Sequence, residues 1–125
     1  MEDDKRVMNS AYILQQIGPY TVVEFRTASL MDPFQLQQIG DELYPLVDQQ
    51  DKRLLVLDFE PVQYLSSQAI GIVLTLHKKL NAIKGKLILC GVGPKLMELL
   101  RITRLDRLLT IKPTQNDVIN VNTVR

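Results

Sequence analysis

The sequence predicts one α/β domain built on a partly parallel sheet. Three observations predict this class. The chain has 125 residues, of which 46% are hydrophobic and 23% charged, as in an ordinary globular domain. Apolar runs that suit strands alternate with amphipathic segments that suit helices. A turn signal near the N-terminus separates two strand-like runs, which favours an antiparallel hairpin at the start of the sheet.

The expected hairpin is followed by a helix and a central strand. Residues 11–17 and 20–25 predict its two strands, joined by a turn at residues 18–19, and a loop over 28–33 comes next. Apolar residues then recur at helical spacing over about 34–49. Asp32-Pro33 provides a candidate cap and a favourable first residue for this helix. Residues 54–57 are all apolar and bounded by charges, which is typical of a strand buried on both faces.

The second half of the chain continues the alternation of helices and strands. After a loop over 61–65, a second helical stripe begins at Ser67 and ends near Lys84-Gly85, because glycine is common just past a helix. The remaining elements are predicted in this order: a strand over 86–90, a helix opened by Gly93-Pro94, a strand over 108–111, and a short helix capped by Thr114 that contains Val118, Ile119 and Val121.

Charge and composition exclude several classes of protein. The formal net charge is +1, although residues 1–60 carry five basic and eleven acidic side chains and residues 61–112 carry nine basic and two acidic ones. So small a net charge excludes a strongly basic nucleic-acid-binding chain. A single cysteine excludes an internal disulfide, and no apolar stretch is long enough to cross a bilayer. We therefore expect a cytoplasmic protein that neither binds nucleic acid directly nor inserts into a membrane.

Few side chains indicate chemistry. His77 has no second histidine and no cysteine or acid at ligand spacing, so we expect no metal site. Cys90 ends a predicted buried strand and has no obvious general base, which argues against nucleophilic catalysis. Residues 91–94 lack the lysine and the further glycines of a phosphate loop. The sequence predicts neither an enzyme nor a cofactor.

Ser66 and Ser67 lie where a loop meets the predicted second helix. A serine there caps the helix by accepting a hydrogen bond from a first-turn amide. A phosphate on the same residue would be stabilised by the free amides and by the helix dipole. The two roles are compatible, and both serines are candidate phosphorylation sites.

Three short motifs follow one another through the middle of the chain. They are Leu-Val-Leu-Asp-Phe at 55–59, Ser-Ser-Gln-Ala-Ile-Gly at 66–71 and Gly-Lys-Leu-Ile-Leu at 85–89, and residues 102–106 extend the pattern. Their order and spacing resemble the STAS family, the anti-sigma-factor antagonist domains, over about 11–121. The resemblance implies a STAS-like mixed sheet with an N-terminal antiparallel hairpin and about four helices mainly on one side. It leaves a flexible N-terminus over 1–10 and a tail over 122–125.

The family pattern at the second helix is Asp-Ser-Ser-Gly-Leu-Gly, and its second serine is the one phosphorylated. Alignment without gaps on Gly71 puts Gln68 on that serine and Ala69 on the first glycine. Ser66 then falls on the Asp, and Ser67 on the first serine. A shift by one residue would put Ser66-Ser67 on the serine pair but would displace Gly71. We prefer the gap-free register, in which Gln68 replaces the usual acceptor and Ser67 is the nearest hydroxyl.

The resemblance implies a non-enzymatic regulatory domain that acts in partner switching. In this family the unphosphorylated antagonist binds an anti-sigma factor that is also a serine kinase, and phosphorylation breaks the complex. The expected partner-binding residues are Asp32, Ser66, Ser67, Gln68 and Ala69. Whether the chain forms a dimer stays open.

Two other functions stay open beside partner switching. STAS domains also occur as soluble subunits of membrane transport or lipid-trafficking complexes, and co-purification with a permease would favour that function. A nucleotide or a small anion could instead bind near Asp32 and Ser67. Saturable binding in a titration would support such a sensor.

Overall fold

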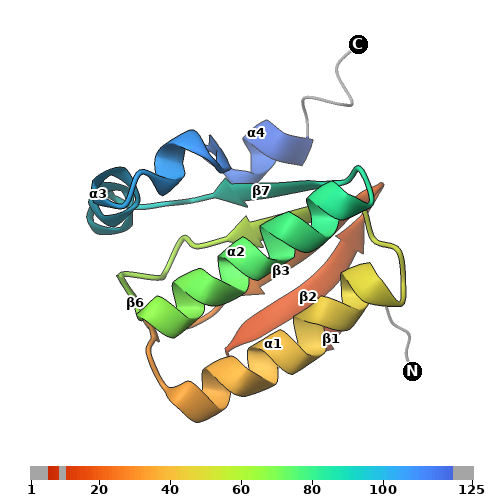
Figure 1. Cartoon of the computed structure of the whole chain (residues 1–125), viewed down its shortest axis with the longest axis horizontal. Helices are drawn as coiled ribbons and strands as arrows, with labels where there is room; N and C mark the ends of the chain where they lie inside the picture. The colour runs from red at the N-terminus through yellow and green to blue at the C-terminus, as the bar shows by residue number, and fades with distance from the viewer. Residues whose placement is uncertain (1–5, 9–10, 120–125) are drawn as a thin grey trace.

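A computed structural model of the chain describes residues 6–8 and 11–119. The strands are β1 (Arg6–Met8), β2 (Tyr12–Ile17), β3 (Tyr20–Phe25), β4 (Ser29–Leu30), β5 (Leu54–Asp58), β6 (Tyr64–Leu65), β7 (Lys86–Cys90) and β8 (Thr110–Lys112). The helices are α1 (Pro33–Asp48), α2 (Ser67–Ala82), α3 (Pro94–Ile102), the 3₁₀ turn η1 (Leu105–Arg107) and α4 (Gln115–Ile119). Figure 1 shows how these elements are arranged.

A six-stranded mixed sheet forms the centre of the domain, in the order β1-β2-β3-β5-β7-β8. The predicted hairpin is confirmed, because β2 pairs antiparallel with β3 from Ile17 opposite Tyr20 to Tyr12 opposite Phe25. The strands β3, β5, β7 and β8 pair in parallel, as expected for strands joined by crossover helices. The expected α/β class and its mixed sheet are therefore confirmed.

Helices cover the two faces of the sheet unequally. Leu55 and Leu57 of β5 face a core shared with α1, α2 and α3, whereas Val56 faces a smaller cluster that includes Val118 of α4. All three β5 residues are at most 1% exposed, which confirms the prediction of a strand buried on both faces. Figure 1 shows α1 and α2 lying across the sheet and α4 beside β7. Three of the four α-helices thus share one side, as the resemblance implied.

The two loops expected over 28–33 and 61–65 contain short strands. β4 lies in the first loop and β6 in the second, and they pair in parallel as a separate two-stranded sheet. A strand of two residues is too short to show an alternating pattern, so the sequence did not reveal it.

The two ends of the chain lie largely outside the described residues. Within the segment 1–10, expected to be flexible, the structure places β1, which pairs antiparallel with β2. The rest of that segment, Val121 of the expected last helix and the tail over 122–125 are not described. The domain boundaries therefore remain a prediction.

Two predicted boundaries differ from the structure. Lys84, and not Gly85, adopts the left-handed conformation after α2, with φ of 62°. Gly85 is needed for another reason, because a Cβ there would lie 2.5 Å from the carbonyl oxygen of Arg53. The last strand begins at Thr110 and not at Leu108, since η1 occupies Leu105–Arg107 and Leu108, its C-cap, is half exposed.

Candidate functional site

The starts of α1 and α2 are held side by side by the pairing of β4 with β6. Ser29 lies opposite Tyr64, and the amide of Ser66 donates to the carbonyl of Leu30 over 3.1 Å. Each short strand is followed within two residues by a helix, so both helices start at the same end of the domain (Figure 1). The sequence could not show this, because residues about 35 apart are joined by the short β4–β6 pair.

Both helix starts are capped as predicted. The hydroxyl of Ser66 accepts a hydrogen bond from the amide of Ala69 over 3.2 Å. The carboxylate of Asp32 accepts one from the amide of Phe34 over 3.2 Å. The capping role of these two side chains is therefore confirmed. Ser67 follows the cap as the first residue of α2 and is exposed.

The predicted site residues fall into an exposed group and a buried one. Asp32, Ser67 and Gln68 are exposed and Ser66 is half-buried. Ala69 was expected on the partner surface, but it is 4% exposed and belongs to the main core. The reason is its place at the start of the apolar stripe of α2, four residues before Val73. Only the side chains of the other four are accessible to a partner.

Three exposed apolar side chains border these residues, and none of the three was predicted from the sequence. Phe34 is 88% exposed, Met31 50% and Tyr64 49%. The signal for Phe34 was present, since it lies off the buried stripe formed by Leu36 and Ile39. We call the following residues together the paired-turn surface: Met31, Asp32, Phe34, Tyr64, Ser66, Ser67 and Gln68.

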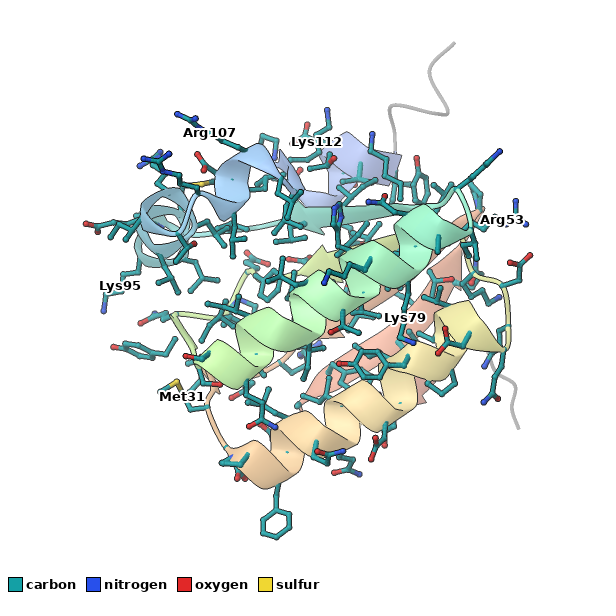
Figure 2. All side chains as sticks on the ribbon, viewed as in Figure 1. Met31, Arg53, Lys79, Lys95, Arg107 and Lys112 are labelled. Atoms are coloured by element: carbon teal, nitrogen blue, oxygen red, sulfur yellow. The ribbon has the colours of Figure 1, made fainter. Side chains whose placement is uncertain are left out.

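Lys95 supplies a positive charge at the edge of the paired-turn surface. Its ammonium lies 4.9 Å from the ring centroid of Tyr64 and donates to the Tyr64 hydroxyl over 3.2 Å. Figure 2 shows Lys95 and Met31 at the same end of the domain. This contact links the start of α3 to β6.

The paired-turn surface is open and offers no enclosed cavity for a small molecule. The hollow beside it, of about 500 Å³, is formed by the first half of α1 from Asp32 to Asp41 and is lined by no basic side chain. Among the described residues no three His, Cys, Asp or Glu side chains are grouped so that they could hold a metal ion. An open surface with apolar and polar side chains is suited to protein contact.

Cys90 and His77, which the sequence singled out, and the side chains at the start of α4 make contacts within the fold. Cys90 is fully buried, and burial followed by the charges of Asp58 and Glu24 raises the pKa of its thiol to about 12. Such a thiol stays protonated and is a poor nucleophile. The side-chain nitrogen of Gln115 donates to Glu24 over 2.8 Å and to Asp58 over 3.0 Å, which ties the start of α4 to the ends of β3 and β5. His77 is half-buried within α2 and lies 3.2 Å from the side-chain amide of Asn81.

Comparison with known proteins agrees with this architecture. BtrV of Bordetella bronchiseptica, named as a proposed anti-sigma factor antagonist, is 34% identical over 80 residues. Those residues are 64% of this chain and 66% of BtrV, just under two thirds of its length. The anti-sigma factor antagonist SpoIIAA in its unphosphorylated form superposes with a TM-score of 0.78 and 20% identity, over 92% of this chain and 99% of SpoIIAA.

A sulfate transporter family protein from Wolinella succinogenes shares the fold at lower identity. Its TM-score is 0.69 with 11% identity, over 86% of this chain and 88% of that one. None of the described helices is both long and apolar enough to cross a membrane.

The strongest of these findings is a match to a family model over most of the described sequence. The model of the STAS domain matches residues 13–118, from the hairpin to the last helix. That range contains β3, β5, β7 and β8, all of β2 but its first residue, and every residue of the paired-turn surface. The chain belongs to the STAS domain family.

Proposed function

We propose that this chain is a non-enzymatic antagonist of the anti-sigma-factor-antagonist type, which binds a cytoplasmic anti-sigma factor or serine kinase through the paired-turn surface. One observation carries the proposal. The paired-turn surface combines three exposed apolar side chains with the starts of two helices and an exposed serine. Apolar anchors with a polar rim are typical of protein interfaces.

Ser67 is the proposed acceptor if the complex is switched by phosphorylation. Its side chain is exposed, whereas the hydroxyl of Ser66 is already engaged as the cap of α2. A phosphate adds nearly two negative charges and would have to be desolvated against the apolar residues of the interface. Phosphorylated Ser67 would therefore break the contact.

Gln68 is proposed to occupy the position of the family's phosphorylated serine. The amide side chain cannot accept a phosphate, and it donates to the carbonyl of Pro33 over 3.4 Å. In this position it would hold the two helix starts in the geometry that the partner recognises. Binding is then either constitutive or switched at the neighbouring hydroxyl of Ser67.

Incubation with candidate anti-sigma kinases tests both versions. The chain is mixed with each kinase of this class from its own genome, with and without ATP, and complexes are detected by native mass spectrometry. We expect a complex with at least one kinase in the absence of ATP. Phosphate mapped to Ser67 supports the switched version, and its absence from both Ser66 and Ser67 leaves the constitutive one. Failure of every kinase to bind contradicts the proposal.

Charge substitutions identify the surface. Ser67→Asp is expected to weaken the complex by about tenfold or more, because it places a carboxylate inside the contact. Asn116→Asp is the matched control, since it adds the same charge to an exposed residue in the first turn of α4, away from the paired-turn surface. Equal weakening by the two substitutions would mean that net charge and not position matters.

The two other functions have weaker support. The sulfate transporter neighbour shares the fold alone, and co-purification with a permease in place of a kinase would favour a transport subunit. An anion sensor is disfavoured by the carboxylates of Asp32 and Asp41 in the hollow beside the site. Saturable amide shifts of the protein in an NMR titration with a nucleotide would support the anion sensor.

A further inference from the structure

A second exposed surface lies at the far end of α3 from the paired-turn surface. The amide of Arg104 donates to the carbonyl of Arg101 over 3.0 Å, and that of Arg107 donates to Arg104 over 3.3 Å. Leu108 then bonds back to Leu105 over 3.1 Å. These bonds fold residues 101–108 into one compact unit, which we call the arginine turn. Lys95 and Arg101 are six positions apart in α3, which at about 1.5 Å per residue separates the backbone of the two by about 9 Å along the helix.

The arginine turn is firmly attached to the core and yet presents apolar side chains to solvent. Leu100 and Leu109 on either side of it are buried, and Leu105 packs against the same core. In contrast, Ile102 is 71% exposed and Leu108 is 51% exposed. With the three apolar residues of the paired-turn surface, they are the large hydrophobic side chains that the described part of the chain exposes. The packing of Leu100, Leu105 and Leu109 therefore fixes the backbone that carries Ile102 and Leu108.

Three arginines accompany these two apolar side chains. Arg101, Arg104 and Arg107 are all exposed, and none forms an ion pair with another described residue. Figure 2 shows Arg107 projecting outward at the edge of the domain. The Lys and Arg side chains of α2, β7 and the turn between them are, by contrast, all lysines: Lys78, Lys79, Lys84 and Lys86. Arginine is enriched at protein interfaces, where lysine is depleted, because its planar fork binds carboxylates in pairs of hydrogen bonds.

The backbone at Arg104 gives a further reason to look for a role. Arg104 has φ of 63°, in the left-handed region that glycine adopts without strain. Helices often end on a glycine at this position. The fold thus holds an arginine where glycine would suit the backbone better, and its exposed side chain makes no described ion pair that would explain it.

We propose that the arginine turn binds an acidic, partly apolar segment of a partner protein, at a surface separate from the paired-turn surface. The three guanidinium groups would pair with carboxylates, while Ile102 and Leu108 would contact apolar residues of the same segment. A membrane surface fits less well, because only two exposed apolar side chains are available to enter the lipid.

A synthetic peptide tests the proposal on the whole chain. The probe is a twelve-residue peptide in which pairs of glutamates alternate with leucines, titrated into ¹⁵N-labelled protein at low salt. We expect saturable shifts in the amides of residues 101–108 and weaker binding as salt is raised. A peptide with lysines in place of the glutamates should produce no such shifts. Absence of saturable shifts with the acidic peptide at millimolar concentration would overturn the proposal.

Arg104→Gly gives a variant whose fold is safe. It removes a charge and relieves the left-handed backbone, so the melting temperature is not expected to fall. Peptide affinity is expected to fall by about tenfold, as for loss of a charge-assisted contact. Lys84→Gly is the matched control, because Lys84 has φ of 62° after α2 and lies outside the arginine turn. Equal loss in both variants would also overturn the proposal.

Two further outcomes would replace the acidic segment by another occupant. Vesicles of phosphatidylserine and phosphatidylcholine that sediment with the wild-type chain but not with Arg104→Gly, while the peptide fails to bind, would identify a membrane surface. Shifts in the arginine turn on raising protein concentration without peptide would identify a second copy of the chain. Either result contradicts the proposal as stated.

Discussion

The side-chain amide of Gln68 donates a hydrogen bond to the backbone carbonyl of Pro33 over 3.4 Å. This contact joins the first turns of α2 and α1, which are 35 residues apart in the sequence. Pro33 directly follows the cap residue Asp32, and Gln68 lies two residues after the cap residue Ser66. The geometry of the paired-turn surface therefore depends on side chains that also hold the two helices together.

The capping hydroxyl of Ser66 and the free hydroxyl of Ser67 can be separated by their effects on stability. Ser66→Ala removes the bond to the Ala69 amide and is expected to lower the free energy of unfolding by about 1 kcal/mol. Ser67→Ala removes an exposed hydroxyl and should change it by less than about 0.5 kcal/mol. Urea denaturation of both variants checks this. A larger loss in Ser67→Ala than in Ser66→Ala would contradict the assignment of the cap.

Asp32 combines a capping bond with a negative charge, and two substitutions distinguish them. Asp32→Ala loses both and should cost about 1 kcal/mol of stability, whereas Asp32→Asn keeps a capping oxygen and should cost less. If the partner recognises the negative charge of Asp32, both variants are expected to bind the partner more weakly. Calorimetric titration with the partner kinase, beside thermal unfolding, measures the two effects. Full binding by Asp32→Asn would show that the charge is not recognised.

Gly71 and Gly85 should respond oppositely to alanine. A Cβ at Gly71 meets nothing within 4 Å, so Gly71→Ala should stabilise the exposed side of α2 by up to about 1 kcal/mol. A Cβ at Gly85 would lie 2.5 Å from the Arg53 carbonyl oxygen, and Gly85→Ala should therefore destabilise the domain. Chemical denaturation gives both values. The prediction fails if Gly71→Ala lowers stability as Gly85→Ala does.

The buried thiol of Cys90 predicts how stability depends on pH. Its pKa is raised from 9.0 to about 12, mainly by burial, so the folded chain keeps a proton that the unfolded chain loses. Stability is therefore complete below about pH 9 and falls as the pH rises toward 12. Burial and the bond to Glu42 raise the pKa of Tyr12 as well, which adds to the loss.

Cys90→Ala isolates the contribution of the thiol to this pH dependence. The variant should show a shallower fall of the free energy of unfolding above pH 9 than the wild-type chain. An unchanged slope would mean that the thiol does not contribute. In the native wild-type chain at pH 8, a thiol reagent should react with Cys90 only as fast as the domain opens.

Much of this architecture could be predicted from the spacing of apolar residues and from the residues typical of turns and helix caps. The run at Leu54–Leu57 identified the central strand, and the caps at Asp32 and Ser66 identified the starts of two helices. These signals are local, because a strand face or a helix cap depends on residues a few positions apart. The hairpin and the family resemblance followed from the same kind of signal.

The assembly of the candidate site could not be predicted in the same way. β4 and β6 have two residues each, and their paired residues are more than thirty positions apart in the sequence. No local pattern in the sequence therefore predicts them. Exposure of Met31 and Tyr64 depends on that pairing and on the contact of Lys95 with the Tyr64 ring. Ala69 was expected on the partner surface because it is close to Ser67 in the sequence. Its position on α2 directs its side chain into the core instead.

Mapping the partner's contact on this chain tests the central claim most directly. The ¹⁵N-labelled chain is titrated with the anti-sigma kinase that binds it in the absence of ATP, and amide shifts are followed by NMR. The paired-turn surface as the binding site predicts the largest shifts at Asp32, Phe34, Ser67 and Gln68. Shifts confined to α4 and the opposite face of the sheet, with these residues unchanged, would contradict it.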